Sequence, residues 1–200
     1  MRIPDDAVIR ALHERHAPTP EALDAVHTHC RIVCQLAEQL HARSGLDADL
    51  SLVRAGALLH DVGVYRLYDQ AGRLDHAQYI RHGLLGYELL RAEGLPEELC
   101  RFASHHTGVG ITREDVLRQE LPLPPADYVA ETPEETLVMY ADKFHTKTAP
   151  PAFLTAAAYQ SLVRRYGAGK VAGFEAMRAT FGDPDVAPLA VAYGQRVIGG

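Results

Sequence analysis

Apolar residues recur every three or four positions along most of this 200-residue chain, as expected for helix faces turned toward a core. The segment between Thr19 and Gly45 shows this spacing most clearly, with apolar residues at positions 23, 26, 33, 36, 37 and 40. Thr19 followed by Pro20 is typical of a helix start, and Ser44 followed by Gly45 is typical of a helix end. The pattern therefore predicts a long amphipathic helix.

Shorter segments with the same spacing follow. The first of these predicted helices opens at 47–49 and runs to His60-Asp61, the second covers 77–93, and the third runs from Pro96 to His105-His106. Further helices begin at Thr112 and at Thr132, and the one from Thr132 carries Asp142. Two or three more follow Pro150-Pro151. Thr132 and Glu135 are expected to form a capping box, with Glu135 reaching back to the cap residue. The proline-rich stretch 121–125 predicts an ordered loop. No segment shows the alternation of a strand, so the sequence predicts an all-α protein.

Length and composition indicate one globular unit. Hydrophobic residues make up 47% of the chain and charged residues 23%, which is ordinary for a globular protein. We divide the chain into an N-terminal helix at 1–19, a central helical domain at 20–150, and a C-terminal helical extension of the same domain at 151–200.

Charge and cysteine content exclude several classes of protein. The net charge of -6 provides no basic surface for a nucleic-acid duplex. The apolar runs fall short of the ~18 residues needed to span a membrane, so no membrane association is expected. The three Cys form an odd set in a chain without a signal-peptide pattern, which predicts reduced thiols and a cytoplasmic protein.

Imidazole and carboxylate side chains stand at the ends or on the apolar faces of several predicted helices. The pair His60-Asp61 closes the apolar run 55–59, and the other members of the series are His29, His82, His105-His106 and Asp142. Transition metals favour these ligand types. Burial of such groups without partners costs several kcal/mol, so the series predicts a metal site rather than unrelated buried residues. His76 and His145 lie close enough in sequence to support it.

Helical spacing separates His105 from His106. His106 shares a face with Leu99, Phe102 and Ala103, whereas His105 falls on the side of Glu98 and Arg101. We therefore expect His106 to point inward and His105 outward.

The ordered series His29, His60-Asp61 and Asp142 resembles the HD-domain metal-dependent phosphohydrolase superfamily. The stretches 57–63, 81–86, 106–110, 121–124 and 140–144 resemble a subgroup of small uncharacterised HD-domain proteins, and the likeness covers roughly residues 20–150. The resemblance implies an HD-domain helical bundle with five core helices, in which 20–150 is the metal-binding domain. His145 departs from the pattern, because a Ser or an aromatic residue is commoner at that position.

The resemblance also implies a ligand set. His29, His60, Asp61 and Asp142 would hold one divalent transition metal, and His82 and His106 would complete a second position with Asp61 as the bridge. Fe, Mn, Co, Ni or Zn would fit, as one ion or two. A metal lowers the pKa of bound water to about 7, so a metal-bound hydroxide would attack the substrate.

The expected activity is hydrolysis of a small phosphate ester or nucleotide, with His60, Asp61, Lys143 and Lys147 as catalytic residues. Lys143 and Lys147 would neutralise phosphate charge, although a cation beside Asp142 could instead only balance that carboxylate. The expected partner is a small phosphorylated, nucleotide-like substrate, and a homodimer is compatible with it. Two alternatives remain open: an HD-fold diiron oxygenase, and a catalytically silent metal-containing module that binds a nucleotide.

Overall fold

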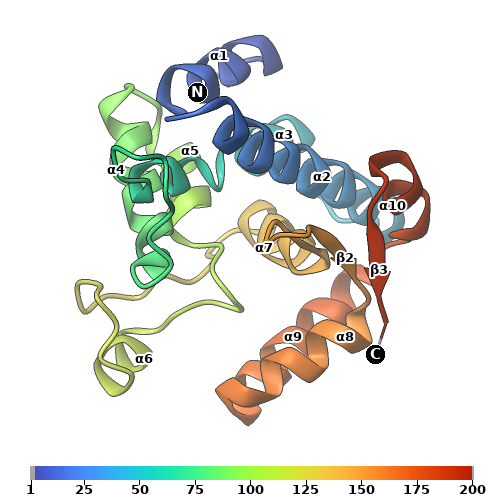
Figure 1. Cartoon of the computed structure of the whole chain (residues 1–200). Coiled ribbons are helices and arrows are strands. Elements are labelled where there is room, and N and C mark those ends of the chain that lie inside the picture. Colours follow the sequence, from blue (N-terminus) through green and yellow to red (C-terminus); the bar gives the residue numbers. More distant parts are fainter. Residues whose placement is uncertain (1–2, 200) are drawn as a thin grey trace.

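The computed structural model describes residues 3–199, most of which form helices (Figure 1). The α-helices are α1 (Asp6–His16), α2 (Pro20–Ser44), α3 (Leu50–Leu59), α4 (His82–Ala92), α5 (Glu97–Ser104), α6 (Arg113–Arg118), α7 (Pro133–Ala141), α8 (Ala156–Val163), α9 (Ala168–Phe181) and α10 (Ala187–Tyr193). Short 3-10 helices lie between some of them: η1 (Val62–Leu67), η2 (Tyr79–Arg81), η3 (Asp142–Phe144) and η4 (Arg164–Tyr166). The prediction of an all-α protein is confirmed.

Five helices, α2, α3, α4, α5 and α7, enclose the main core. α2 packs along α3 and α7, and α4 packs along α5 and η1. Figure 1 shows α7 in the middle of the molecule, between the other four of these helices and the C-terminal helices α8 and α9. The core is apolar and includes the fully buried rings of Phe102, Tyr140, Phe144, Phe153 and Phe174. The C-terminal residues thus pack on the same core as the central helices.

The predicted end signals of α2 are present. The Thr19 hydroxyl accepts a hydrogen bond from the backbone N–H of Ala22, and Gly45 adopts the left-handed conformation with φ of 65°. The capping box at Thr132 is only half formed. Thr132 caps α7, but the Glu135 carboxylate accepts from the backbone N–H of Glu131, one residue before the cap. Glu135 is held there by an ion pair with Arg101, at 2.7 Å.

A small sheet corrects the expectation that the chain forms no strands. β1 (His145–Thr146) pairs antiparallel with β2 (Ala152–Leu154), and β2 pairs parallel with β3 (Arg196–Ile198). These strands have two or three residues, too few for an alternating pattern to be visible in sequence. The sheet ties the chain after α7 to the last described residues.

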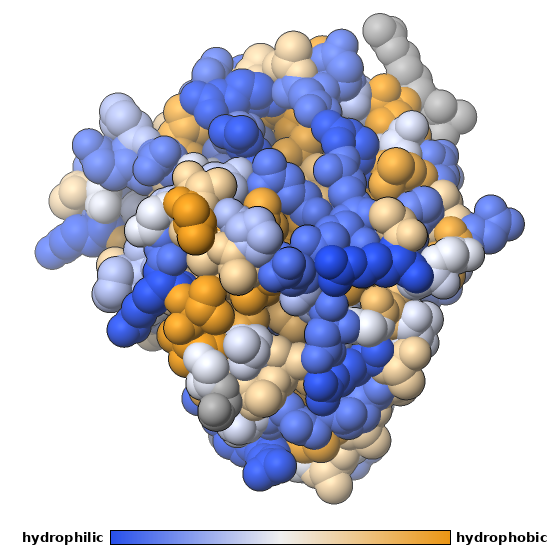
Figure 2. Space-filling view, turned by 90° about the vertical axis from the view of Figure 1, so that its right-hand side faces the viewer, coloured by the Kyte–Doolittle hydropathy of each residue, from blue (hydrophilic) through white to orange (hydrophobic). Residues whose placement is uncertain are grey.

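The surface that carries α10 and β3 is mostly hydrophilic, with smaller apolar areas between the polar side chains (Figure 2). Val191 and Val197 are among the exposed apolar residues of these two elements. Within residues 3–199, no helix is both long and apolar enough to cross a membrane.

Candidate metal centre

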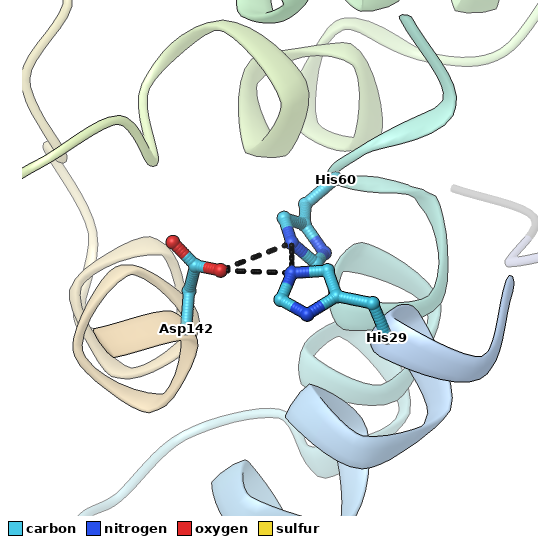
Figure 3. A group of neighbouring side chains, drawn as sticks. All are labelled: His29, His60 and Asp142. Carbon is cyan, nitrogen blue, oxygen red and sulfur yellow. Dashed lines mark hydrogen bonds and ion pairs between the residues drawn. The ribbon is translucent and has the colours of Figure 1, made fainter. Parts of the chain in front are cut away.

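Two helix ends and the middle of α2 bring four of the predicted ligands together. His60 follows the last residue of α3, Asp61 follows it, and Asp142 follows the last residue of α7. His29 lies inside α2 on its buried face. Figure 3 shows the carboxylate of Asp142 directed at the imidazoles of His29 and His60. Helix ends suit such residues, because the side chains lie beyond the packed helix body and can converge.

The first cluster consists of His29, His60, Asp61 and Asp142. The Nε2 atoms of His29 and His60 are 3.3 Å apart, and His29 Nε2 lies 3.0 Å from Asp142 Oδ1 and 3.3 Å from Asp61 Oδ2. His60 Nε2 lies 3.6 Å from Asp142 Oδ1 and 3.7 Å from Asp61 Oδ2. Atoms that bind one ion at about 2.1 Å stand about 3 to 3.5 Å from one another. The spacing of these four side chains therefore fits a single divalent ion.

The second cluster lies on the other side of Asp61. His82, the first residue of α4, and His106, just after α5, place their Nε2 atoms 3.0 Å apart. These atoms are 3.5 Å and 3.7 Å from Asp61 Oδ1. The two oxygens of Asp61 thus face different clusters, Oδ2 the first and Oδ1 the second.

Asp61 supplies a direct test of whether a cation fits. The residue is 1% exposed, and its Oδ1 is buried without a hydrogen-bond partner among the described residues. A buried acceptor left unpaired costs about 1–3 kcal/mol, and more when it is charged. A cation between Asp61 Oδ1, His82 and His106 would satisfy this atom.

Backbone carbonyls orient three of the four imidazoles. The Nδ1 atoms of His60, His82 and His106 lie 2.7, 2.7 and 2.8 Å from the carbonyl oxygens of Ala57, Tyr79 and Ala103. A carbonyl can only accept, so each Nδ1 carries the proton and each Nε2 presents a lone pair to its cluster. This is the tautomer that a metal ligand requires.

Burial also favours the neutral imidazole, except at His60, whose pKa Cys30 and Asp61 raise despite its burial. Burial lowers the pKa of His29 to about 3, and it lowers the pKa values of His82 and His106. Burial also lowers the pKa of His145 to about 4. These side chains are therefore uncharged at neutral pH, the form in which imidazole binds metals.

The carboxylates stay ionised for a different reason. Burial alone would raise the pKa of Asp61, but the ammonium of Lys147 holds that pKa well below its usual value. For Asp142, the ammonium of Lys143 overcomes the same effect of burial. Both groups are available as anionic ligands.

The two lysines occupy different positions. The Lys143 side chain is 4% exposed, and its ammonium donates to Asp142 Oδ2 at 2.7 Å and to the carbonyl of His106 at 3.0 Å. The Lys147 side chain is 20% exposed; its ammonium pairs with Asp61 Oδ2 and lies 5.4 Å from the centre of the Tyr79 ring. Lys147 is thus nearer to solvent, whereas Lys143 fixes Asp142.

His105 and His106 diverge as the spacing predicts, although α5 ends at Ser104 and not at His106. His106 is 3% exposed and faces His82, whereas the ring of His105 is partly exposed and bonds to the hydroxyl of Ser104 at 2.6 Å. The chain keeps enough helical turn after Ser104 for His106 Nδ1 to reach the carbonyl of Ala103.

Of the two predicted supporting histidines, only His145 joins the site. His76 is exposed, whereas His145 is buried, with its ring next to that of His29. Tyr79 and Gln195 also contact the site and were missed by sequence reasoning. No sequence pattern points to Gln195, because it lies 50 residues after His145 and outside every motif.

The comparisons with known proteins show the family of the chain. The model of the family described as HD domain matches residues 26–147. The uncharacterized protein MJ0778 of Methanocaldococcus jannaschii is 40% identical over 124 residues, which cover 60% of this chain and 66% of that protein. The tRNA (cytidine(56)-2'-O)-methyltransferase of Thermoplasma volcanium is 36% identical over 121 residues, 60% of this chain but only 32% of that enzyme. The chain thus matches slightly less than two thirds of the first relative and about a third of the second.

Solved structures show the same fold. The HD domain of the L. monocytogenes phosphodiesterase PgpH has a TM-score of 0.56 at 19% identity, covering 92% of this chain and 98% of that one. The same domain in complex with cyclic-di-AMP also has a TM-score of 0.56, at 20% identity, covering 96% and 99%. Because the family model spans more than half of the chain, and His29, His60, Asp61 and Asp142 converge within the matched range, this protein belongs to the HD domain family.

Proposed function

We propose that this chain is a metal-dependent phosphohydrolase that cleaves a small phosphate ester or nucleotide. The observation that carries the proposal is the position of Asp61, whose two buried oxygens face two separate clusters of imidazoles. His29, His60, Asp61 and Asp142 would hold one ion, and Asp61, His82 and His106 a second. Mixed nitrogen and oxygen ligands suit Fe, Mn, Co, Ni or Zn.

A pair of such ions would acidify a water molecule and withdraw charge from a phosphoryl group. The protein itself would contribute orientation and charge. Lys143 keeps Asp142 ionised and fixed. Lys147 pairs with Asp61 in this structure, and its partly exposed ammonium would bind a non-bridging phosphate oxygen of the substrate.

Two findings support a small, phosphorylated substrate. The HD domain of PgpH has this fold and is described as a phosphodiesterase domain in complex with cyclic-di-AMP, a nucleotide. The net charge of -6 disfavours a long polyanion, which would need an extended basic surface.

The test is a phosphate-release screen over mononucleotides, cyclic and linear dinucleotides and sugar phosphates, with protein loaded separately with Mn, Fe, Co, Ni or Zn. We expect turnover with at least one metal and none after treatment with chelator. Lys147→Gln should lower kcat/KM by about 10²-fold with metal content unchanged, since one charge-assisted contact is lost. Arg66→Gln, at an exposed position in η1, is the matched control and should retain activity.

Other outcomes would replace the proposal. Iron binding with O₂ consumption and no phosphate release would identify a diiron oxygenase. Thermal stabilisation by a nucleotide without turnover by any metal form would identify a binding module.

A further inference from the structure

His29 differs from the other three imidazoles of the centre. Its Nδ1 does not meet a backbone carbonyl but lies 2.8 Å from Nδ1 of His145. The carbonyls near His29 belong to the interior of α2, where they accept helix hydrogen bonds. The orientation of His29 therefore depends on a side chain from a different part of the chain.

His145 is in turn held by Gln195. The Nε2 atom of His145 lies 2.8 Å from Oε1 of Gln195. The rings of His29 and His145 have their centroids 5.1 Å apart and their planes at 27°. His145 is 4% exposed, so neither of its ring nitrogens can readily turn to water instead.

The small sheet holds both residues in place. His145 is the first residue of β1, paired with Phe153 of β2, and Gln195 directly precedes β3, whose Arg196 pairs with Ala152. Gln195 also donates its backbone N–H to the carbonyl of Ala190 in α10. The C-terminal residues are thus anchored on both sides of the contact with His145.

The contact with Gln195 determines where the ring protons of His145 and His29 lie. An amide oxygen only accepts, so the proton of a neutral His145 is on Nε2 and its Nδ1 has a lone pair. Nδ1 of His29 then carries a proton and donates it to His145, which leaves the lone pair on His29 Nε2. That atom is the one 3.0 Å from Asp142 and 3.3 Å from Asp61.

We infer that Gln195 and His145 form a positioning chain that fixes the tautomer and orientation of His29, so that the C-terminal segment sets the affinity of the first ion. The inference rests on the proposed role of His29 as a ligand. It extends the centre beyond residues 26–147, where the family model matches, because Gln195 lies outside that range.

The experiment measures binding of Co²⁺ to the full chain by equilibrium dialysis and by the visible absorption of the bound ion. Gln195→Leu removes the acceptor at a partly exposed position and should weaken binding of the first ion by about 10–100-fold, the usual effect of losing a group that orients a metal ligand. Gln195→Glu keeps an acceptor and should bind Co²⁺ as the unaltered protein does.

His145 supplies the second pair of variants. His145→Phe removes the acceptor for His29 and should weaken binding by a similar factor and change the absorption spectrum. His145→Asn places Oδ1 near the position of the lost Nδ1 and should restore most of the affinity. Gln70→Leu, at an exposed loop position, is the control for a Gln-to-Leu change and should have no effect.

The outcomes separate this inference from the proposed function. If the unaltered protein binds no Co²⁺, the proposed metal centre is wrong. If it binds Co²⁺ and folded Gln195→Leu binds it equally well, only the positioning chain is wrong. Equal weakening by Gln195→Glu and Gln195→Leu would also overturn the chain, because Gln195 would then act as a donor.

Discussion

Single atoms decide which histidines belong to the centre. The neighbours His105 and His106 have the same chemistry, but only His106 places Nε2 near Asp61, at 3.7 Å from Oδ1. His82 stands in an equivalent position, at 3.5 Å from the same oxygen. Residue identity therefore states which side chains could bind a metal, and side-chain direction states which of them face the proposed centre.

We predict that His106→Ala loses the second ion and lowers activity by more than about 100-fold, beyond the effect typical of supporting residues. His82→Ala should behave in the same way, because both imidazoles face one position. His105→Ala should keep the full metal content of the unaltered protein. Metal analysis of the three purified variants checks this, and greater loss in His105→Ala than in His106→Ala would contradict it.

At the scale of elements, a close approach between η1 and α4 holds the two clusters at a fixed separation. Gly63 of η1 lies against the first residues of α4. A Cβ at Gly63 would come within 2.0 Å of the carbonyl oxygen of His82 and 2.2 Å of the backbone N of Gly86. Both contacts are with backbone, so a side chain at Gly63 would push α4, and His82 with it, away from Asp61.

Gly63→Ala should therefore destabilise the fold by about 3 kcal/mol and weaken binding of the second ion. Gly169→Ala in α9 is the matched control, because a Cβ there meets no atom within 4 Å. That variant should match the unaltered protein or gain up to about 1 kcal/mol. Urea unfolding in the presence of chelator measures both, and equal stability of the two variants would refute the packing argument.

At the scale of the whole molecule, α1 is attached to the centre through a buried histidine. His13 is 0% exposed, with Nε2 2.8 Å from the carbonyl of Leu58 and Nδ1 2.7 Å from the hydroxyl of Tyr65. Leu58 lies two residues before His60. The N-terminal helix thus braces the end of α3, and the bond needs a neutral imidazole that accepts from Tyr65.

Burial lowers the pKa of His13 to about 3 from 6.5, so the unfolded chain binds a proton at His13 more readily than the folded one. The resulting stability is complete above pH 6.5 and is lost as the pH falls toward 3. Between pH 7 and 5 His13 alone should cost about 2 kcal/mol. Urea unfolding at both pH values, with chelator, should show a loss of at least this size in the unaltered protein and a loss that is about 2 kcal/mol smaller in His13→Gln. Equal losses in the two proteins would contradict the assignment.

The sequence by itself determined the helices, the family and the set of candidate ligands. Apolar spacing and end signals such as Thr19 and Gly45 are local, so they can be read along the chain. The ligand set could be read because each member lies on a buried face or at a helix end, where an ionisable residue stands out against apolar neighbours. The facing of His106 also followed from spacing, even though α5 ends two residues earlier than expected.

Only the tertiary structure decided how those residues share the centre. No local pattern shows that the two oxygens of Asp61 face different clusters, since the four imidazoles come from separate elements. Glu135 pairs with Arg101, which lies 34 positions away in the sequence, and Gln195 contacts His145, which lies 50 positions away. The strands next to this last contact are too short to leave a pattern in the sequence. Such pairings depend on the packing of the whole chain, because the free energy that holds them comes from the shared core and not from their own sequence.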